Sequence, residues 1–101
     1  MVIAEISVVP LGTGTTSVSK YVARVIEVLR QEKGLKHELT AMGTIIEGEL
    51  DEVLGAIKKV HEALFDGEVK RVVTTIKIDD RRDKDLTMGY KVQSVLEKVK
   101  D

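Results

Sequence analysis

Three short stretches of the sequence combine residue types that could bind a small molecule. The first is "GTGTTS", residues 12–17, which lies between a run of apolar residues and a helical pattern. Its glycines and hydroxyls could present free N–H groups to an anion or small ligand at a helix N-terminus. A glycine-permitted turn capped by Ser17 explains the same residues without a ligand. Because Ser17 replaces the third glycine of a GxGxxG motif, no dinucleotide-binding fold is expected.

The second stretch is the charge cluster "KIDDRRDKD", residues 77–85, with four acidic and four basic side chains. Arg81 and Arg82 could bind an oxyanion, together with Gly14 and Ser17 at the helix N-terminus. The acidic residues lack the spacing of a metal-binding loop, so no metal site is expected. A solvated loop whose charges pair with one another is the other interpretation.

The third stretch, "MGTIIEGE", residues 42–49, places Glu47 in a strand that follows a hairpin near Gly43. A carboxylate near the inner face of a sheet needs a partner, because burying it unpaired is costly. A cationic or amidine-like ligand would supply that partner. Lys77 on a neighbouring strand would do so equally well.

The sequence contains no visible catalytic constellation. His37 and His61 have neither metal-ligand spacing nor a nucleophile beside them, and His61 falls on the flank of a helical stripe, where a packed histidine is expected. No Ser-His-Asp arrangement, paired acid–base motif or cofactor lysine motif stands out. The residues therefore predict a small binding domain without a cofactor rather than an enzyme.

Composition excludes several classes of site and partner. The absence of cysteine removes disulfides, thiolate zinc sites and thiol nucleophiles. A net charge of -1 from interspersed charges gives no basis for binding nucleic acid. No apolar run approaches the roughly 20 residues that span a bilayer, so no membrane partner and a cytoplasmic protein are expected. The lack of asparagine and the 33% of charged residues are typical of a thermophile.

Hydrophobic periodicity predicts seven elements. Alternating residues indicate strands, and apolar residues at intervals of three and four indicate helices. The predicted strands are 2–9, 36–42, 44–49 and 70–80, and the predicted helices are 17–33, 51–65 and a narrow apolar stripe from Met88 to Val99. Ser17 is the expected N-cap of the first helix, and Pro10 the expected end of the first apolar run.

The order β-α-β-β-α-β, followed by a third helix, predicts an α+β ferredoxin-like sandwich with a four-stranded antiparallel sheet. Two helices cover one face. The other face should carry residues from the first and fourth strands that are too apolar for water and too polar for a dry core: Ile3, Glu5, Ser7, Val9, Arg71, Val73, Thr75 and Lys77. Such a face, and the apolar stripe of the third helix, predict a homodimer or a dimer of dimers.

The whole pattern resembles the small thiamine-binding protein family. The resemblance rests on "AEISVVPLGTGTTSVSKYV", "MGTIIEGEL", "HEALF" and "TTIKIDDRRD", and it covers nearly all of residues 1–101 as a single domain. It implies a ferredoxin-like fold, assembly into dimers or tetramers, and non-enzymatic binding of thiamine or its hydroxymethyl-pyrimidine moiety.

Thiamine joins a permanently cationic thiazolium ring to an aminopyrimidine, and this chemistry selects candidate ligand contacts. Glu47 could accept hydrogen bonds from the aminopyrimidine or offset the cationic charge. Met42 and Tyr21 could cover ring faces. Four hydroxyls could meet the remaining polar atoms, those of Ser7, Thr13, Thr44 and Thr75.

Two other functions fit the same residues. One is a regulatory module that binds an anionic metabolite through residues 13–17 with Arg81 and Arg82. The other is an oligomeric scaffold without a small-molecule ligand. An acylphosphatase-like enzyme would need an arginine in the loop from Leu11 to Thr16, and that loop has none.

Overall fold

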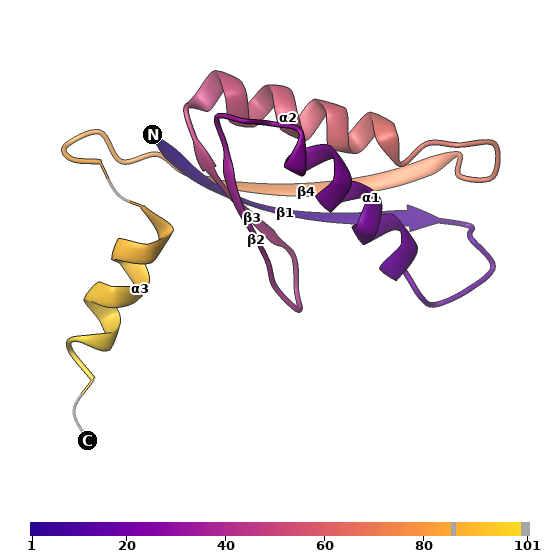
Figure 1. The fold of residues 1–101 in the computed structure, drawn as a ribbon. Coiled ribbons are helices and arrows are strands. Elements are labelled where there is room, and N and C mark those ends of the chain that lie inside the picture. Colours follow the sequence, from indigo (N-terminus) through magenta and orange to yellow (C-terminus); the bar gives the residue numbers. More distant parts are fainter. Residues whose placement is uncertain (86, 100–101) are drawn as a thin grey trace.

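An antiparallel sheet with two helices on one face forms the body of the protein (Figure 1). The structure, a computed structural model, describes residues 1–85 and 87–99. Its elements in chain order are β1 (Val2–Leu11), α1 (Ser19–Arg30), β2 (Lys36–Leu39), β3 (Thr44–Gly48), α2 (Leu50–Ala63), β4 (Arg71–Asp79) and α3 (Met88–Leu96). The strand order β2-β3-β1-β4, with every pair antiparallel, confirms the predicted ferredoxin-like fold.

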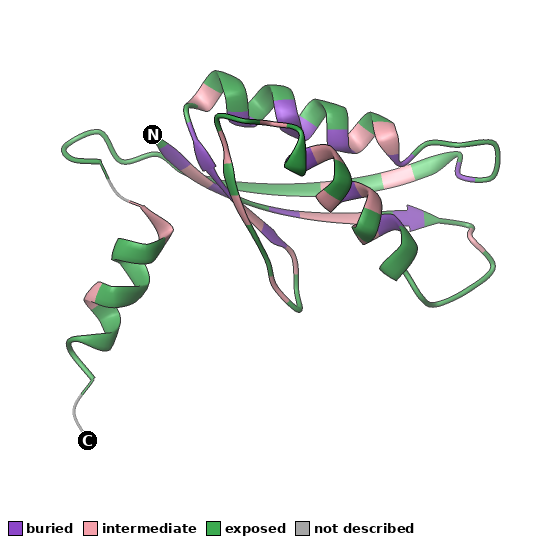
Figure 2. Cartoon of the chain, viewed as in Figure 1, coloured by how far each residue is buried: buried purple, intermediate pink, exposed green. Residues whose placement is uncertain are grey.

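The core lies between the sheet and the two helices α1 and α2. Alternate residues of β1 point into it, because successive side chains of a strand face opposite sides. Apolar positions of both helices meet them at a spacing of three or four residues. The largest fully buried side chains are Ile6, Leu29, Ile46, Leu64, Val25, Val53, Val60 and Val69. In Figure 2, buried stretches alternate with more exposed ones along α1 and α2 and also occur on the strands.

The opposite face of the sheet, called here the open face, has the composition that alternation predicts. The register pairs Glu5 with Lys77 and Val9 with Val73. Since directly opposite residues share a face, these pairs confirm the predicted set on β1 and β4. Neither α1 nor α2 covers this face.

The first strand runs beyond its predicted end. Pro10 does not stop β1, which continues to Leu11. The pairing with β3 ends where Ile6 meets Thr44, so beyond that point β1 pairs with β4 alone. A residue without an N–H group is tolerated on a strand with a free edge.

The first helix begins later than its predicted start. Its N-cap is Val18, which makes no side-chain cap, so the prediction of Ser17 as the cap is wrong. The N–H group of Ser17 donates to the Thr15 hydroxyl at 3.2 Å, and the Ser17 hydroxyl lies 3.3 Å from that of Ser19. These local bonds hold Ser17 in the loop before the helix.

His61 is a packed histidine, as predicted. It is half-buried, its Nδ1 lies 2.7 Å from the Thr74 hydroxyl, and its ring meets Phe65 edge-on at 5.5 Å.

The third helix projects away from the body (Figure 1). None of its residues is buried within the described part of the chain, and Val92, Val95 and Leu96 are exposed. The radius of gyration is 15.2 Å, whereas a compact domain of this length has about 13 Å. The apolar stripe predicted on this helix is present and has no covering partner within the described residues.

Candidate functional site

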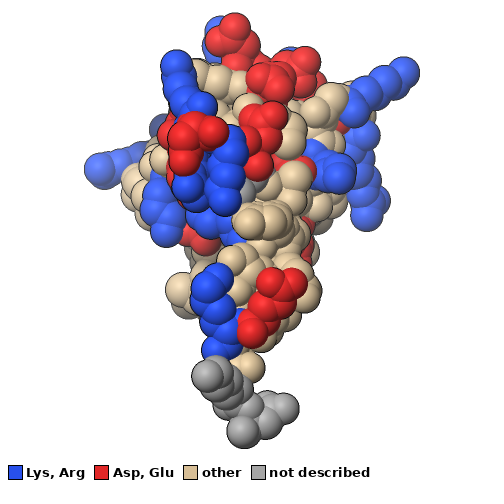
Figure 3. Space-filling view, turned by 90° about the vertical axis from the view of Figure 1, so that its left-hand side faces the viewer, with Lys and Arg blue, Asp and Glu red and all other residues tan. Residues whose placement is uncertain are grey.

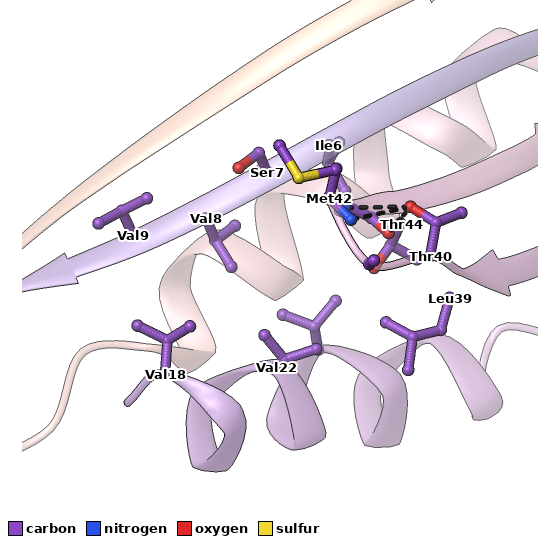
Figure 4. Close-up of a pocket in the computed structure, with 13 residues that line it drawn as sticks. Ile6, Ser7, Val8, Val9, Val18, Val22, Leu39, Thr40, Met42 and Thr44 are labelled. Atoms are coloured by element: carbon purple, nitrogen blue, oxygen red, sulfur yellow. Dashed lines mark hydrogen bonds between the residues drawn. The ribbon is translucent and has the colours of Figure 1, made fainter. Parts of the chain in front are cut away.

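A small cavity lies between the N-terminal half of α1, the free edge of β1 and the turn that joins β2 to β3 (Figure 4). Its volume is about 170 Å³. None of the described residues that line it is charged. They are mostly apolar, with three hydroxyl side chains among them: Ile6, Ser7, Val8, Val9, Val18, Val22, Val25, Leu39, Thr40, Ala41, Met42, Gly43 and Thr44.

The strand register explains why a hollow exists there. Because β3 begins at Thr44, opposite Ile6, no strand continues along that edge of β1. The space that a longer β3 would fill is bounded instead by the turn 40–43 and by α1. Val8 reaches into it from β1, and Val22 faces it from α1 (Figure 4).

The turn 40–43 is held by a local hydrogen-bond network around one threonine. The Thr40 hydroxyl accepts from the N–H groups of Met42 at 3.3 Å and Gly43 at 3.1 Å, and it lies 2.9 Å from the Gly43 carbonyl oxygen. A Cβ atom on Gly43 would lie 2.8 Å from the carbonyl oxygen of Ile6. Only glycine allows the turn to approach β1 this closely.

Two side chains at the cavity differ sharply in exposure. Thr44 is only 4% exposed. No side-chain hydrogen bond of the described residues involves its hydroxyl, and because none of their buried polar atoms lacks a partner, this oxygen reaches the surface of the cavity rather than being sealed in the core. It is therefore free to bond a ligand. Met42 is 85% exposed and stands beside the opening, where its flexible thioether could cover a ring.

The structure brings together three of the predicted ligand residues and separates the other four. Ser7, Met42 and Thr44 line the cavity, although Ser7 points away from α1 (Figure 4). Thr75 lies opposite Ser7 but on β4, outside the cavity. Thr13 belongs to the loop after β1, where its hydroxyl donates to the Thr15 carbonyl at 3.0 Å.

Tyr21 is a core residue and does not line the cavity. It is buried on α1, and the cationic groups of Lys20 and Arg24 each lie 5.2 Å from its ring centroid. Its ring is therefore committed to packing and to cation–π contacts within the domain.

The hydrogen-bond partner of Glu47 within the chain is neither a cationic ligand nor Lys77, the two candidates suggested by the sequence. Glu47 lies on the open face, opposite Ile3 and Lys36, so its expected place near the inner face is wrong, and it is 3% exposed. Its carboxylate accepts the N–H group of Met88 at 2.6 Å, at the first residue of α3. Lys77 pairs with Glu5 in the register of β1 and β4, so it is not the partner of Glu47.

The residues of the predicted anion site do not meet within one chain. Gly14 and Ser17 follow the end of β1, whereas Arg81 and Arg82 follow the end of β4 beside the start of β1. The two groups therefore lie at opposite ends of the sheet (Figure 1).

The charges after β4 pair with one another, as one of the two interpretations predicted. Arg81 binds Asp83 at 2.6 Å and Arg82 binds Asp80 at 2.8 Å. The hydrogen bonds from these arginines hold the pKa of both carboxyl groups below the usual range and raise the pKa of both guanidinium groups. Figure 3 shows acidic and basic side chains interspersed over this end of the molecule.

Other features of the described residues include a larger but more open groove. This groove, of about 620 Å³, lies between β2 and α3 and is lined by His37 among others. Residues 1–85 and 87–99 hold no cluster of three side chains suited to a metal ion. No helix in the same residues is long and apolar enough to cross a bilayer.

Sequence reasoning missed most of the cavity wall. Val8, Val22 and Leu39 were visible only as members of strand or helix patterns. Thr40 had a local signal, because a threonine three residues before a glycine can close a turn with its hydroxyl. The meeting of these segments depends on where β3 starts, which no local pattern specifies.

Fold and cavity together define a small ferredoxin-like domain with an uncharged cavity of the size of one ring. The chain belongs to the thiamine-binding protein family, whose model matches residues 4–96. The UPF0045 protein of Methanothermobacter thermautotrophicus is 48% identical over 100 residues, covering 98% of this chain and 100% of the relative. The UPF0045 protein YqgV of Bacillus subtilis is 46% identical, covering 94% of each chain.

Solved structures agree with this assignment. The crystal structure of protein MJ1052 from Methanocaldococcus jannaschii superposes with a TM-score of 0.86 at 48% identity, over 95% of this chain and 96% of the other. A Thermotoga maritima protein, described as a candidate thiamine biosynthesis/salvage protein, superposes with a TM-score of 0.76 at 28% identity, over 93% of this chain and 97% of the other.

Proposed function

We propose that this protein binds the hydroxymethyl-pyrimidine moiety of thiamine, free or as part of the vitamin, without catalysing a reaction. The observation that carries this proposal is the cavity of about 170 Å³ beneath α1. An apolar protein cavity of about 150 Å³ accepts benzene. A single six-membered ring therefore matches the space in size.

The chemistry of the wall suits an aminopyrimidine. Apolar side chains such as Val8 and Val22 can cover the ring faces, and the unbonded Thr44 hydroxyl can meet a ring nitrogen or the exocyclic amine. The free edge of β1 beyond Ile6 adds backbone groups. A few polar groups in an apolar pocket are the usual means of fixing a small ligand.

The two rings of thiamine cannot both lie inside the cavity. The thiazolium ring would remain at the opening, and no charged side chain lines the interior to receive its positive charge. A phosphate group likewise finds no cation there. Free thiamine and hydroxymethyl-pyrimidine are thus the favoured ligands over thiamine diphosphate.

Membership of a family named for thiamine binding supports this proposal, as does the likeness to the Thermotoga maritima protein. A carrier or sensor in oligomeric form is the role that we propose. The open face and the exposed stripe of α3 are the surfaces that an assembly would cover.

The test is isothermal titration with hydroxymethyl-pyrimidine, thiamine and thiamine diphosphate in phosphate-free buffer. We expect micromolar or tighter binding of the first two. Binding of the diphosphate alone would favour an anion site at residues 13–17 instead. Absence of binding for all three would contradict the proposal and leave an oligomeric scaffold.

A further inference from the structure

We infer that the ligand site is completed between two copies of this chain, and that the second copy closes the opening of the cavity. This inference rests on the proposed function. It adds that one chain alone presents half a site.

The rim of the cavity is apolar and exposed. Met42, Leu39 and Val18 all border the cavity, and each exposes a large hydrophobic side chain to water. Met42 is the extreme case at 85%. A ligand bound in one chain would meet solvent directly across this rim.

The apolar rim continues onto the open face. Val9 lines the cavity and lies directly opposite Val73 in the register of β1 and β4. Val73 is 46% exposed, and Leu11, two residues beyond Val9 on the same face, is exposed as well. Together, Val9, Leu11, Val18, Leu39, Met42 and Val73 form a patch that we call the rim patch. Exposed apolar side chains gathered around a cavity mark interaction surfaces more often than ones scattered singly over a surface.

The chain exposes more surface than a compact monomer of its mass does. Its exposed area amounts to 7064 Å², whereas a compact monomer of this mass exposes about 5,700 Å². The projecting α3 accounts for part of the excess. The excess of about 1,400 Å², which includes the surface of α3, compares with the roughly 800 Å² that each partner contributes to a standard interface.

The shape and charge of the rim patch favour a second copy as its occupant. The patch holds both a protruding side chain, Met42, and a hollow, the cavity. A two-fold contact brings the same patch of two subunits together, so a surface with a knob and a hole can complement itself. The six residues of the patch carry no charge, which leaves no complement for a basic or acidic partner.

This arrangement explains how a cavity of one ring can serve a ligand of two. The pyrimidine ring occupies the hollow of one chain, and the second ring lies against the rim patch of the other. Affinity for thiamine then depends on dimerisation, although no single chain needs a larger cavity.

The variant Val73→Glu tests this, because Val73 belongs to the rim patch but does not line the cavity. We expect sedimentation velocity to show a smaller assembly and titration to show at least tenfold weaker thiamine binding. The added carboxylate would attract the cationic ligand, so a loss of affinity cannot come from its charge. The matched control is Leu54→Glu on α2, at 43% exposure, which should leave assembly and affinity unchanged.

Dilution of the unaltered protein gives the same test without a substitution, in case Val73→Glu does not fold. Thiamine affinity should fall when the protein concentration drops below that of dimer dissociation. A Val73→Glu protein of smaller assembly that binds thiamine as tightly as the wild type would overturn the inference and leave the proposed function intact. An unchanged assembly in Val73→Glu would overturn it too. Failure of the wild type to bind either pyrimidine ligand would instead remove the proposed function.

Discussion

At the scale of single residues, the Thr44 hydroxyl is the group that the cavity most clearly holds ready for a ligand. Thr44→Val keeps the shape of the side chain and removes one neutral hydrogen bond, worth about 0.5–1.5 kcal/mol. We therefore expect hydroxymethyl-pyrimidine to bind roughly 2- to 12-fold more weakly in a calorimetric titration.

Thr75→Val is the matched control for that measurement. Thr75 is also a strand threonine that the sequence proposed as a ligand contact, but it lies on β4 outside the cavity. Its substitution should leave the affinity within a factor of about two. Equal losses in both variants would move the site from the cavity to the open face.

Glu47 shows what sequence reasoning could and could not supply at this scale. The sequence raised the need of a buried carboxylate for a partner, although it placed Glu47 near the inner face and the structure places it on the open face. The partner, the Met88 N–H group, lies at the start of a helix 41 positions further along the chain. No local pattern connects the two.

At the scale of elements, the turn 40–43 determines whether the cavity keeps its wall. Gly43→Ala would place a Cβ atom 2.8 Å from the Ile6 carbonyl oxygen, a backbone atom that cannot move aside cheaply. Overpacking of this kind costs about 1–3 kcal/mol. We expect a loss of that size in urea unfolding, together with weaker ligand binding because the turn must shift.

Gly55→Ala should change the free energy of unfolding in the opposite direction, and it serves as the control. Gly55 lies within α2, and an added Cβ atom there meets nothing within 4 Å. Alanine should stabilise the helix by about 0.5–1 kcal/mol. If Gly43→Ala proved as stable as Gly55→Ala, the close approach of the turn to β1 would be wrong.

The carboxylate of Asp66 holds the loop from α2 to β4, and its contribution to the stability of the fold depends on pH. Asp66 accepts the N–H groups of Val69 and Glu68 at 2.8 Å each and binds Arg24 at 3.0 Å. These bonds lower its pKa from 3.8 to about 2. Because the folded-state pKa is depressed, the stabilisation is present above the ordinary pKa and is lost as pH falls through the lowered one.

Asp66→Asn should therefore be less stable than the wild type near neutral pH. The difference should shrink between about pH 4 and pH 2, where the wild-type carboxylate takes up its proton. Urea midpoints of both proteins over this range measure it. A difference that stays constant with pH would show that the carboxylate charge does not stabilise the loop.

The elements themselves were largely predictable, because periodicity reports which face of each segment is buried. The alternation in β1 and β4 gave the composition of the open face correctly. The ends of the elements were harder to predict. Strand β1 continues past Pro10 because no strand pairs with it there on the side of β3. The cavity could not be predicted for the same reason, because it lies where β3 has not yet begun to pair with β1.

At the scale of the whole molecule, α3 is the part that the single chain leaves unexplained. The helix is held at its first residue by Glu47 and by an ion pair between Lys91 and Asp79. Thr87 caps it by accepting the Tyr90 N–H group at 3.0 Å. Its apolar stripe nonetheless faces water, so this surface and the rim patch are separate regions that an assembly could cover.

Two separate contact surfaces would build a dimer of dimers, and a substitution on α3 can distinguish them. Val95→Lys changes an exposed residue of the stripe that makes no contribution to the core. We expect the unfolding free energy of the domain to change by less than about 0.5 kcal/mol, as for other exposed positions. Sedimentation velocity should show an assembly of about half the size, while thiamine affinity stays at the wild-type value because the rim patch is untouched. A stability loss above about 1 kcal/mol would mean instead that α3 folds back onto its own sheet, and an unchanged assembly would assign the stripe to some other partner.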